Sequence, residues 1–472
     1  MAKKQRSRLE DDYTGDRISK LPDEILGLIL SSMSLKEAIK TSALSSRWRS
    51  LWIVTRKLDI DLDSTTILDN RRNSYNINKL RFKFVRWIDR LFTTILPESS
   101  STTLNRFRVV FDLSSLFSGW IDDWLSSAVS RKVESLELIL NTYSNSRAER
   151  CYCFPYEKGN FPDNLKLLKK LNLHYVNVSG AAVAFLLGNC RLLEHLSLSR
   201  CGNGLSSLEV VGTSPVFKCL EISQCTSLKS IVVRESNVVC IKYAGPSIPH
   251  SHFKLEGVHR LTQLWIKGRP EMMRYDIKNI RGIIDMFDSV LPQLHTLKIY
   301  TMSKITGNDT LEKIMPKLKE LVVVLGREYL DNCSLVPIIN WFGVAPCLER
   351  FILEASHQVP RALEANYLLN GSDYDVSKIN RKIEVQLSYS HIKEVEFVGY
   401  RGVHNHLQMI TQLVRHAVAL EKIIVDPRSF ELRPNMPWDR ISRIQMEDEI
   451  IARQHAEDQL KHVASRINVY IL

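Results

Sequence analysis

The stretch DRISKLPDEILGLILSSMSLKEAIKTSALSSRWRSLW, from Asp16 to Trp52, decides the N-terminal fold. Its apolar positions recur at i, i+4, i+7 and i+8, which is one face of a helix: Leu21, Ile25, Leu28 and Ile29. Pro22 suits the first turn of this helix, because the N–H that it lacks would have no partner there. The pattern therefore predicts a short helix with an apolar stripe.

Two more helices are predicted in the same stretch. Ser34-Leu35-Lys36-Glu37 has the spacing of a capping box, and Ser45-Ser46 can cap a third helix. That third helix would show Trp48, Leu51 and Trp52 on one face. Three such short helices bury too little apolar surface to be stable alone. Either a second protein or the rest of this chain is expected to cover them.

The residues of this stretch follow the order of a known motif. They are Leu21-Pro22-Asp23-Glu24-Ile25-Leu26, then Ile29-Leu30, then Leu44-Ser45-Ser46-Arg47-Trp48-Arg49-Ser50-Leu51-Trp52. The stretch resembles an F-box, and the resemblance implies docking on the Skp adaptor of a cullin–RING ubiquitin ligase. The adaptor-facing positions of the motif fall on Leu21, Pro22, Ile25, Ile29, Leu30, Leu35 and Trp48. The family pattern has no catalytic residue in this domain.

The composition is that of an ordinary globular protein. Of 472 residues, 44% are hydrophobic and 25% are charged, and the net charge of +12 favours acidic partners. The sequence has no apolar run long enough to span a membrane and no secretory signal at its start. The basic residues of the segment 1–15 are either a nuclear address or part of a disordered tail. Nine scattered cysteines indicate reduced thiols, and hence a cytoplasmic or nuclear location.

The segment 56–103 is predicted to link the F-box to the rest of the chain. Leu58-Asp59-Ile60-Asp61-Leu62 alternates between apolar and acidic residues, as a strand does. Residues 64–78 are polar and are expected to form a loop. A helix should follow, with a broad apolar face made of Leu80, Phe84, Trp87, Ile88, Leu91 and Phe92.

A repeated pattern, L-x-x-L-x-L with any apolar residue at L, runs from Leu104 to Leu353. Its most regular copies are Leu168-x-x-Leu171-x-Leu173, Leu193-x-x-Leu196-x-Leu198 and Phe217-x-x-Leu220-x-Ile222. The copies are spaced by about 24–25 residues, which is a leucine-rich-repeat period. Asn177, Cys201 and Cys225 follow these strands, and side chains there can satisfy backbone groups at the turn.

The segments between the repeated strands differ along the chain. Helices are predicted from Trp120 to Val129 and from Ala181 to Leu187, so that strands and helices stack into a parallel solenoid. Between Cys225 and Gly245 the period fails, because Leu228-x-x-Ile231-x-Val233 and Val238-x-x-Ile241-x-Tyr243 crowd together. We expect strands without helices in that region. Residues 364–382 are polar and predict a surface loop.

The C-terminal part predicts one strand–helix–strand unit. Its first strand segment is Ile392–Gly402 and its second is Leu420–Asp426. The helix between them is marked by Leu407, Ile410, Leu413, Val414 and Ala417. This unit resembles the FBD module that follows leucine-rich repeats in plant F-box proteins. A charged helix from Arg440 to Ser465 and an edge strand from Ile467 to Leu472 are expected to close the chain.

The predicted fold class is α/β, in which a three-helix F-box precedes a leucine-rich-repeat solenoid of parallel strands with helices. The solenoid ends in the FBD-like βαβ unit. The predicted segments are a disordered basic tail (1–15), the F-box (16–55), the linker (56–103), the solenoid (104–380), the FBD-like module (381–426) and the closing helix with its edge strand (427–472).

Signatures of catalysis and of metal binding are weak. The sequence has neither a phosphate-binding G-x-x-x-x-G-K-[ST] loop nor a G-x-S-x-G nucleophile elbow. Cys151-Tyr152-Cys153 has no second pair at zinc spacing, and His250-x-His252 and His404-x-His406 are expected to be surface histidines. Neither a cofactor nor a metal is predicted. Scattered basic residues do not favour nucleic-acid binding.

A target-binding surface is predicted on the outward face of the repeated strands. Side chains alternate across a strand, so residues between the apolar ones point away from the core. The residues assigned to this surface are Lys170, Asn172, His174, Trp265, Lys267 and Tyr300. Trp265 and Tyr300 are the expected anchors, because aromatic side chains contribute much of the binding energy at protein interfaces. Alternatively, another segment of the chain covers them.

These observations predict a non-catalytic substrate-recognition subunit of a Skp–cullin–F-box ubiquitin ligase. The F-box would bind the Skp-type adaptor, and through it the cullin, while the repeats bind an unknown target protein. Neither a membrane nor a nucleic acid is an expected partner. The alternative is a leucine-rich-repeat interaction module that does not engage a ligase.

Overall fold

The computed structural model places most of the predicted elements. It describes residues 18, 20–33, 35–45, 47–51, 57–61, 74–95, 104–140, 151–156, 165–245, 252–268, 284–301, 313–326, 335–355, 389–402, 404–428, 443–461 and 467–472. The predicted tail (1–15) and the predicted loop 364–382 lie outside these residues. The chain forms two compact units, residues 1–205 and 206–472.

The first unit begins with the F-box helices. These are α2 (Asp23–Ser31), α3 (Leu35–Lys40), the 3₁₀ turn η1 (Thr41–Ala43) and α4 (Trp48–Leu51). Pro22 directly precedes α2, and the Trp48 backbone N–H donates to Ser45 Oγ at 3.4 Å. The predicted Ser45 cap is therefore confirmed. Helix α4 packs against α2 and η1.

Five parallel strands form the sheet of the first unit. Their order is β1 (Lys57–Asp61), β2 (Arg106–Val110), β3 (Ser135–Ile139), β5 (Lys170–His174) and β7 (His195–Ser199). A separate pair consists of β4 (Tyr152–Cys153) and β6 (Val176–Asn177). The helical segments are α6 (Ser74–Arg90), the π-helical turn η3 (Leu91–Ile95), η4 (Ser115–Phe117), α7 (Ser118–Ser130), η6 (Leu165–Leu167) and α9 (Gly180–Asn189).

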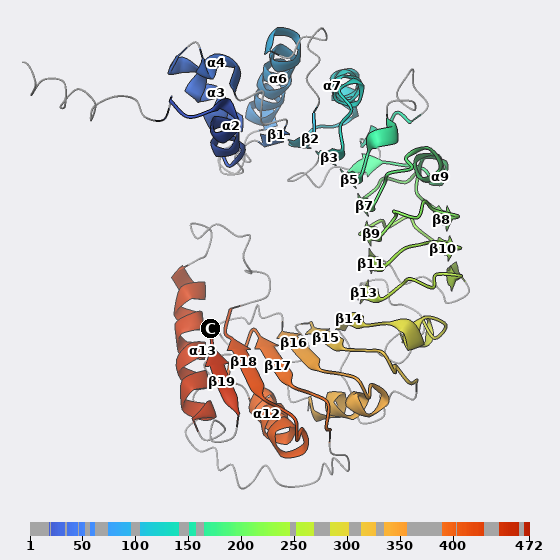
Figure 1. The fold of residues 1–472 in the computed structure, drawn as a ribbon, viewed down its shortest axis with the longest axis vertical. Coiled ribbons are helices and arrows are strands. Elements are labelled where there is room, and N and C mark those ends of the chain that lie inside the picture. The colour runs from blue at the N-terminus through green and yellow to red at the C-terminus, as the bar shows by residue number, and fades with distance from the viewer. Residues whose placement is uncertain are drawn as a thin grey trace, which may run out of the picture. The chain divides into compact units, whose positions relative to one another are not determined.

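Helices and strands of the first unit share one core. Figure 1 shows α6 and α7 on the same side of β1, β2 and β3. The inward side chains of β5 and β7 are completely buried, as are Leu125 of α7 and Leu186 of α9. The strand–helix repeat is thus confirmed here. Helix α6 begins at Ser74, so the predicted loop 64–78 was wrong for its last residues, which join the amphipathic helix.

The turns after the strands repeat with the sequence period. Tyr175, Arg200 and Gln224, which directly follow β5, β7 and β9 (Cys219–Ser223), all have positive φ. Asn177 Oδ1 then accepts a hydrogen bond from the Gly204 backbone N–H at 3.0 Å. A Cβ on Gly204 would lie 2.6 Å from that oxygen, so this contact requires glycine. The predicted role of Asn177 at the turn is confirmed.

The second unit contains nine parallel strands in one sheet. Their order is β9, β11 (Cys240–Gly245), β13 (Gln263–Gly268), β14 (Thr296–Thr301), β15 (Glu320–Leu325), β16 (Arg350–Ala355), β17 (Glu394–Val398), β18 (Lys422–Asp426) and β19 (Asn468–Ile471). The helical segments are η9 (Leu291–Gln293), η11 (Val336–Val344), α12 (His404–His416) and α13 (Arg443–Leu460).

A second, three-stranded parallel sheet replaces helices near the start of this unit. Its order is β12 (Phe253–Glu256), β10 (Ser230–Arg234) and β8 (Ser207–Val211). Residues 207–245 contain strands and turns but no helix, which confirms the prediction for the part between Cys225 and Gly245. The two crowded repeats separate, because Ile231 belongs to β10 and Ile241 to β11. Figure 1 shows β8 and β10 opposite β9 and β11.

The end of the second unit follows the prediction. The parallel strands β17 and β18 flank α12 and complete the βαβ unit, and β19 pairs with β18 as an edge strand. The predicted boundary of an FBD-like module at residue 381 lies outside the described residues. Tyr400 follows β17 by two residues, and its hydroxyl donates to Gln459 Oε1 of α13 at 2.6 Å.

Candidate docking surfaces

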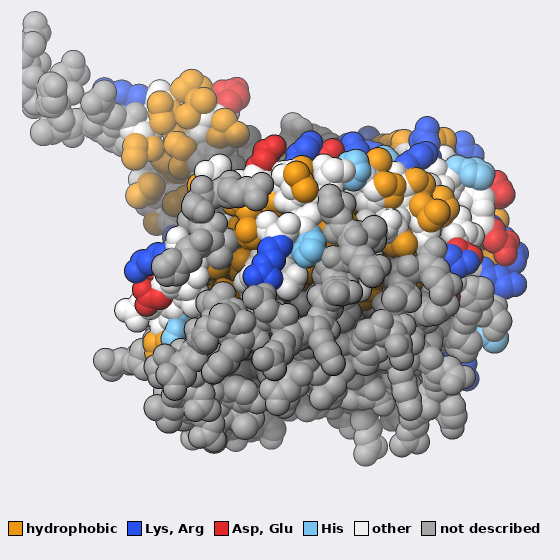
Figure 2. All heavy atoms as spheres, turned by 90° about the horizontal axis from the view of Figure 1, so that it is seen from below, with side chains coloured by type: hydrophobic (Ala, Val, Ile, Leu, Met, Phe, Trp, Pro, Cys, Tyr) orange, Lys and Arg blue, Asp and Glu red, His pale blue; other side chains and the backbone are white. Residues whose placement is uncertain are grey.

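The helix α2 leaves large apolar side chains in contact with solvent. The exposed fractions are 43% for Ile25, 66% for Leu28 and 40% for Ile29. Ile18, Met33 and Leu44 of the same F-box are also exposed. Figure 2 shows hydrophobic side chains gathered at the F-box, at the upper left of the view. Several large apolar side chains exposed on one short segment make it a candidate interaction surface.

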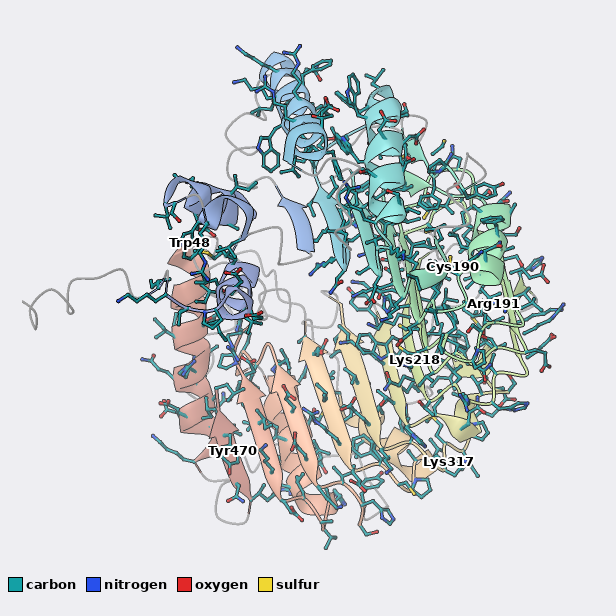
Figure 3. The ribbon with its side chains drawn as sticks, turned by 45° about the horizontal axis from the view of Figure 1, so that its top comes forward. Trp48, Cys190, Arg191, Lys218, Lys317 and Tyr470 are labelled. Carbon is teal, nitrogen blue, oxygen red and sulfur yellow. The ribbon has the colours of Figure 1, made fainter. Side chains whose placement is uncertain are left out.

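The seven predicted adaptor-facing residues fall into different environments. Ile25, Ile29 and Pro22 are exposed, and Leu21 is half-buried. Leu30 and Trp48 are 1% and 4% exposed, and Figure 3 labels Trp48 among the F-box helices. In this chain Leu30 and Trp48 are thus buried and do not lie on the exposed face, and their part in adaptor binding stays a prediction. The side chain of Leu35 lies outside the described part.

An ion pair fixes the start of α2 relative to the start of α4. Arg47 Nη2 lies 2.5 Å from Asp23 Oδ1, and it also donates to the Leu21 carbonyl oxygen at 2.7 Å. Both side chains are exposed, so the ion pair alone adds little stability. Its contribution is orientation: it holds the Leu21–Asp23 segment beside the exposed face of α2.

The predicted target-binding residues form two groups of three, one in each compact unit. In the first unit, Lys170 is exposed, whereas Asn172 and His174 are half-buried. Asn172 Nδ2 donates to Glu137 Oε1 at 3.1 Å, and Arg106 and Arg108 lie 3.1 and 3.3 Å from Glu137 Oε2. The polar side chains of neighbouring strands therefore already bind one another.

His174 is held in its neutral form. Burial lowers its pKa to about 4, and the positive charge of Arg200 adds to the effect. The ring stacks on Tyr175 with the ring centroids 4.9 Å apart, and the Arg200 guanidinium lies 5.0 Å from the Tyr175 centroid. At neutral pH this group presents aromatic surface and a neutral imidazole.

The group in the second unit consists of aromatic rings and lysines. Lys242 Nζ lies 4.3 Å and Lys298 Nζ 5.5 Å from the ring centroid of Trp265. Lys267 Nζ lies 4.4 Å from the centroid of Tyr300. Both rings are partly exposed. Cation–π contacts hold the rings in place, so that they can act as rigid anchors for a protein partner.

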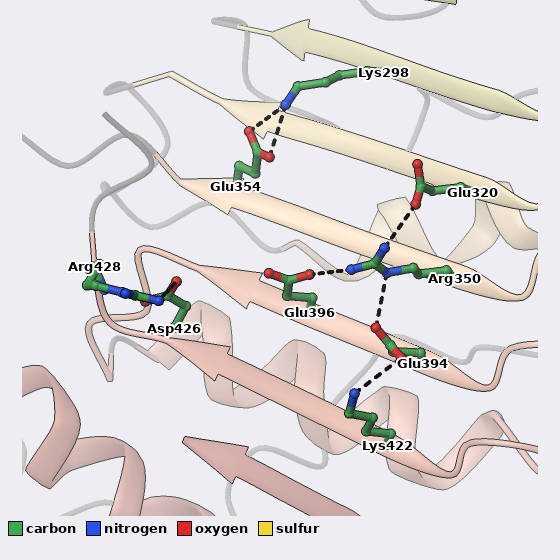
Figure 4. A network of polar contacts seen from close by, with 9 residues as sticks. All are labelled: Lys298, Glu320, Arg350, Glu354, Glu394, Glu396, Lys422, Asp426 and Arg428. Carbon is green, nitrogen blue, oxygen red and sulfur yellow. Dashed lines mark hydrogen bonds and ion pairs between the residues drawn. The ribbon is translucent and has the colours of Figure 1, made fainter. Parts of the chain in front are cut away.

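Further along the same face, the side chains are buried and paired. Val322, Val324, Ile352 and Val398 form a buried apolar cluster against which Tyr300 packs. Beside it, Arg350 lies 2.8–3.2 Å from carboxylate oxygens of Glu320, Glu394 and Glu396 (Figure 4). Lys298 Nζ donates to both oxygens of Glu354 at 2.8 and 3.0 Å. On the strands β14 to β17, the buried and charged side chains named here therefore find their packing and ion-pair partners within this chain.

The sequence had no signal for this network. Arg350 and Glu396 are 46 residues apart, and Lys298 and Glu354 are 56 apart. They meet because the strands align in register, with Glu320, Arg350, Glu394 and Lys422 as successive Cα partners. To predict these ion pairs, one would have to know in advance which residues of neighbouring strands are Cα partners.

One predicted surface histidine is buried. His406 of α12 packs between Phe397 and Tyr400, and burial, with the charge of Arg401, lowers its pKa to about 4. The prediction was wrong because the helix turns this position toward the core. Within the described ranges, no three metal-ligating side chains come together, and no helix is long and apolar enough to cross a membrane.

Comparison with known proteins agrees with this architecture. The F-box domain model matches residues 18–55, and the leucine-rich-repeat domain model of At1g61320/AtMIF1 matches residues 161–470. The second match covers more than half of the chain. The chain belongs to the plant F-box/leucine-rich-repeat family. The predicted family and fold class are thus confirmed.

Individual relatives from Arabidopsis thaliana extend the comparison. The F-box/LRR-repeat protein At2g42730 is 25% identical over 457 residues, which are 89% of this chain and 93% of the relative. The F-box/LRR-repeat protein At3g03360 is 30% identical over 251 residues, or 50% and 48% of the two chains. The F-box/FBD/LRR-repeat protein At5g22700 is 36% identical over 124 residues, or 26% and 24%. This plant F-box/leucine-rich-repeat protein therefore resembles the first relative along almost its whole length.

Proposed function

We propose that this F-box/leucine-rich-repeat protein is the substrate-recognition subunit of a Skp–cullin–F-box ubiquitin ligase. Its F-box would bind the Skp-type adaptor, which in turn binds the cullin, and its repeats would bind a target protein. The observation that carries the proposal is the exposed apolar face of α2 above a buried F-box core. Membership in the F-box family supports the same partner.

The proposed role is not catalytic. A recognition subunit accelerates ubiquitin transfer by holding the target close to the reacting subunits, which raises the effective concentration of the reactants. The side chains on the two docking surfaces suit this role, because they are anchors and ion pairs. The proposed location is cytoplasmic or nuclear, where a cullin-type ligase would act on its target.

The target would be held by the partly exposed rings of Trp265 and Tyr300. Their lysine neighbours favour an acidic segment on the target. The buried cluster and the Arg350 network on β14–β17 are supports for these anchors. Changing Trp265 to Ala should weaken target binding and leave adaptor binding intact, so that the two surfaces are separable.

Co-expression with a Skp adaptor, followed by size-exclusion chromatography, tests the adaptor assignment. The wild-type chain should co-elute with the adaptor. The double variant Ile25→Glu and Ile29→Glu should bind at least ~100-fold more weakly, because it places two charges in the centre of an apolar interface. Both side chains are exposed, so the variant should still fold.

Leu116→Glu is the matched control, since Leu116 is an exposed leucine of the same unit outside the F-box. It should co-elute like the wild type. Co-elution of the α2 double variant at the wild-type level would overturn the docking assignment. Failure of the wild-type chain to bind the adaptor would favour an interaction module that is not part of a ligase.

A further inference from the structure

Two cysteines lie directly opposite each other on neighbouring strands of the second unit. Cys219 opens β9, Cys240 opens β11, and the two residues are Cα partners in the parallel pairing. Neighbouring strands lie about 4.7–4.9 Å apart, within the range of Cα separations that a disulfide spans. The two thiols are hydrogen-bonded to each other. Among the cysteines that the structure describes, no other two are partners across strands.

The surroundings of Cys240 favour its thiolate form. The hydrogen bond from Cys219 lowers the pKa of Cys240, and the nearby Lys242 lowers it further, against the opposing effects of burial and of Glu221. By contrast, burial raises the pKa of Cys190, the residue that ends α9 (Figure 3), to about 12. The thiolate is the nucleophile that attacks an oxidant, so the surroundings of Cys240 favour its reactive form, whereas those of Cys190 do not.

We propose that Cys219 and Cys240 are a modification site at which hydrogen peroxide forms a reversible disulfide. The Cys240 thiolate attacks a peroxide oxygen, an S–O bond forms as the O–O bond breaks, and the hydroxide that leaves takes up a proton. The Cys219 sulfur then attacks the sulfenic sulfur, the S–S bond forms as the S–O bond breaks, and the hydroxide that leaves takes up the Cys219 proton to form water. Two thiols lose two electrons, and one peroxide becomes two water molecules.

The position of the pair connects the oxidation to the sheet surface. Lys242 lies two residues after Cys240 on the same strand face, and its ammonium contacts the ring of Trp265. The disulfide would link β9 to β11 and close a loop that contains β10. It would therefore restrain the strand that supports the Trp265 anchor, and a thiol reductant would release it. This site does not depend on the proposed ligase function.

Peptide mapping of the full-length protein tests the proposal. The purified chain is treated with hydrogen peroxide, alkylated and digested with trypsin without reduction. Oxidation should link the peptide CLEISQCTSLK, residues 219–229, to ESNVVCIK, residues 235–242. Dithiothreitol should separate them, and the oxidised protein should melt several degrees higher than the reduced protein.

The first peptide also contains Cys225, so matched variants are needed. Cys225→Ser should keep the cross-link, whereas Cys219→Ser should reduce its yield at least ~10-fold. Cys347→Ser, at an exposed cysteine outside the pair, should have no effect. A cross-link through Cys225, or peroxide treatment that leaves the wild-type pair as thiols, would overturn the proposal. Fragment spectra of the wild-type cross-link identify the bonded cysteine even if a variant fails to fold.

Discussion

Helix α2 and the strands β14–β18 depart from the usual distribution of side chains in opposite directions. Helix α2 leaves Ile25, Leu28 and Ile29 in contact with water, while the strand face buries Glu354, Glu396 and Asp426. Both arrangements are costly unless something compensates. On the strands the compensation is visible, because Lys298, Arg350 and Arg428 pair with these carboxylates (Figure 4).

The difference leads to a prediction about which surface binds another molecule. The charges on the strands are neutralised inside this chain, so the face is complete as it stands. The apolar face of α2 has no such compensation in the described structure, and a partner protein would supply it. Three experiments test this contrast, from the largest expected effect to the smallest.

The largest effect is expected for the buried residue beneath the α2 face. Trp48→Ala should destabilise the F-box by ~3–5 kcal/mol, because it opens a large cavity in a small core. Ile25→Ala on the exposed face should change its stability by less than about 0.5 kcal/mol. Hydrogen exchange of the α2 amides measures both. If the α2 amides lost the same protection against exchange in both variants, Ile25 would be part of the F-box core.

The same reasoning explains what a double variant Pro22→Ala and Trp48→Ala would do. This double variant should abolish adaptor pull-down while the repeats stay folded. The main reason is that the F-box itself unfolds when Trp48 is lost from its core. Pro22→Ala alone should keep the α2 helix and weaken binding less. The single variants therefore separate loss of the surface from loss of its support.

An intermediate effect is expected in the charged network. Arg350 and Arg234 have side chains that are 41% and 42% exposed, but Arg350 pairs with Glu396 at 8% exposure and Arg234 with Glu256 at 52%. Arg350→Met should therefore cost ~1–3 kcal/mol, since it removes the guanidinium that neutralises a buried carboxylate. Arg234→Met should cost less than about 1 kcal/mol. Urea unfolding, followed in the second unit, compares them. If both variants lost the same unfolding free energy, the buried ion pair of Arg350 would stabilise the protein no more than the exposed ion pair of Arg234.

The smallest effect is a pH dependence. His406 is neutral in the folded chain and has a pKa of about 4, whereas an unfolded histidine titrates near about 6.5. The unfolded state therefore binds more protons between these values, and stability falls as the pH drops below about 6.5. The loss at pH 5 should be roughly 1–2 kcal/mol. His406→Phe should reduce this loss, measured as the difference between the melting points at pH 7 and pH 5.

His174 provides the companion measurement in the first unit. Its pKa is also lowered to about 4, so it should give a separate decrease in stability over the same range. The His406→Phe variant should keep that decrease. If the variant showed the same total loss as the wild type, burial of His406 would not govern the acid sensitivity of its unit.

Much of the fold follows from local patterns. The F-box stretch, the L-x-x-L-x-L spacing, the helix-free segment and the βαβ unit are each visible as a periodicity of apolar residues. These predictions succeeded because the spacing of side chains within one element determines which face can be buried. The second sheet was not predicted, because β10 and β11 have the same apolar pattern and differ only in the sheet that they join.

The candidate sites were less accessible to sequence reasoning. Ile29 and Leu30 are adjacent and similar in chemistry, yet one is exposed and the other buried. His406 lies in a polar stretch and is nevertheless enclosed by Phe397 and Tyr400. Such differences depend on neighbours that come from other segments, and composition does not reveal them.

By itself, the sequence determined that this chain has an F-box, repeated parallel strands and few features of an enzyme. Only the tertiary structure decided that Leu30 and Trp48 are buried, that Arg350 meets three carboxylates, and that Cys219 faces Cys240. The physical reason is the range of the interactions. Periodicity acts within one strand or helix, whereas burial and pairing require the register between strands that are distant in the sequence.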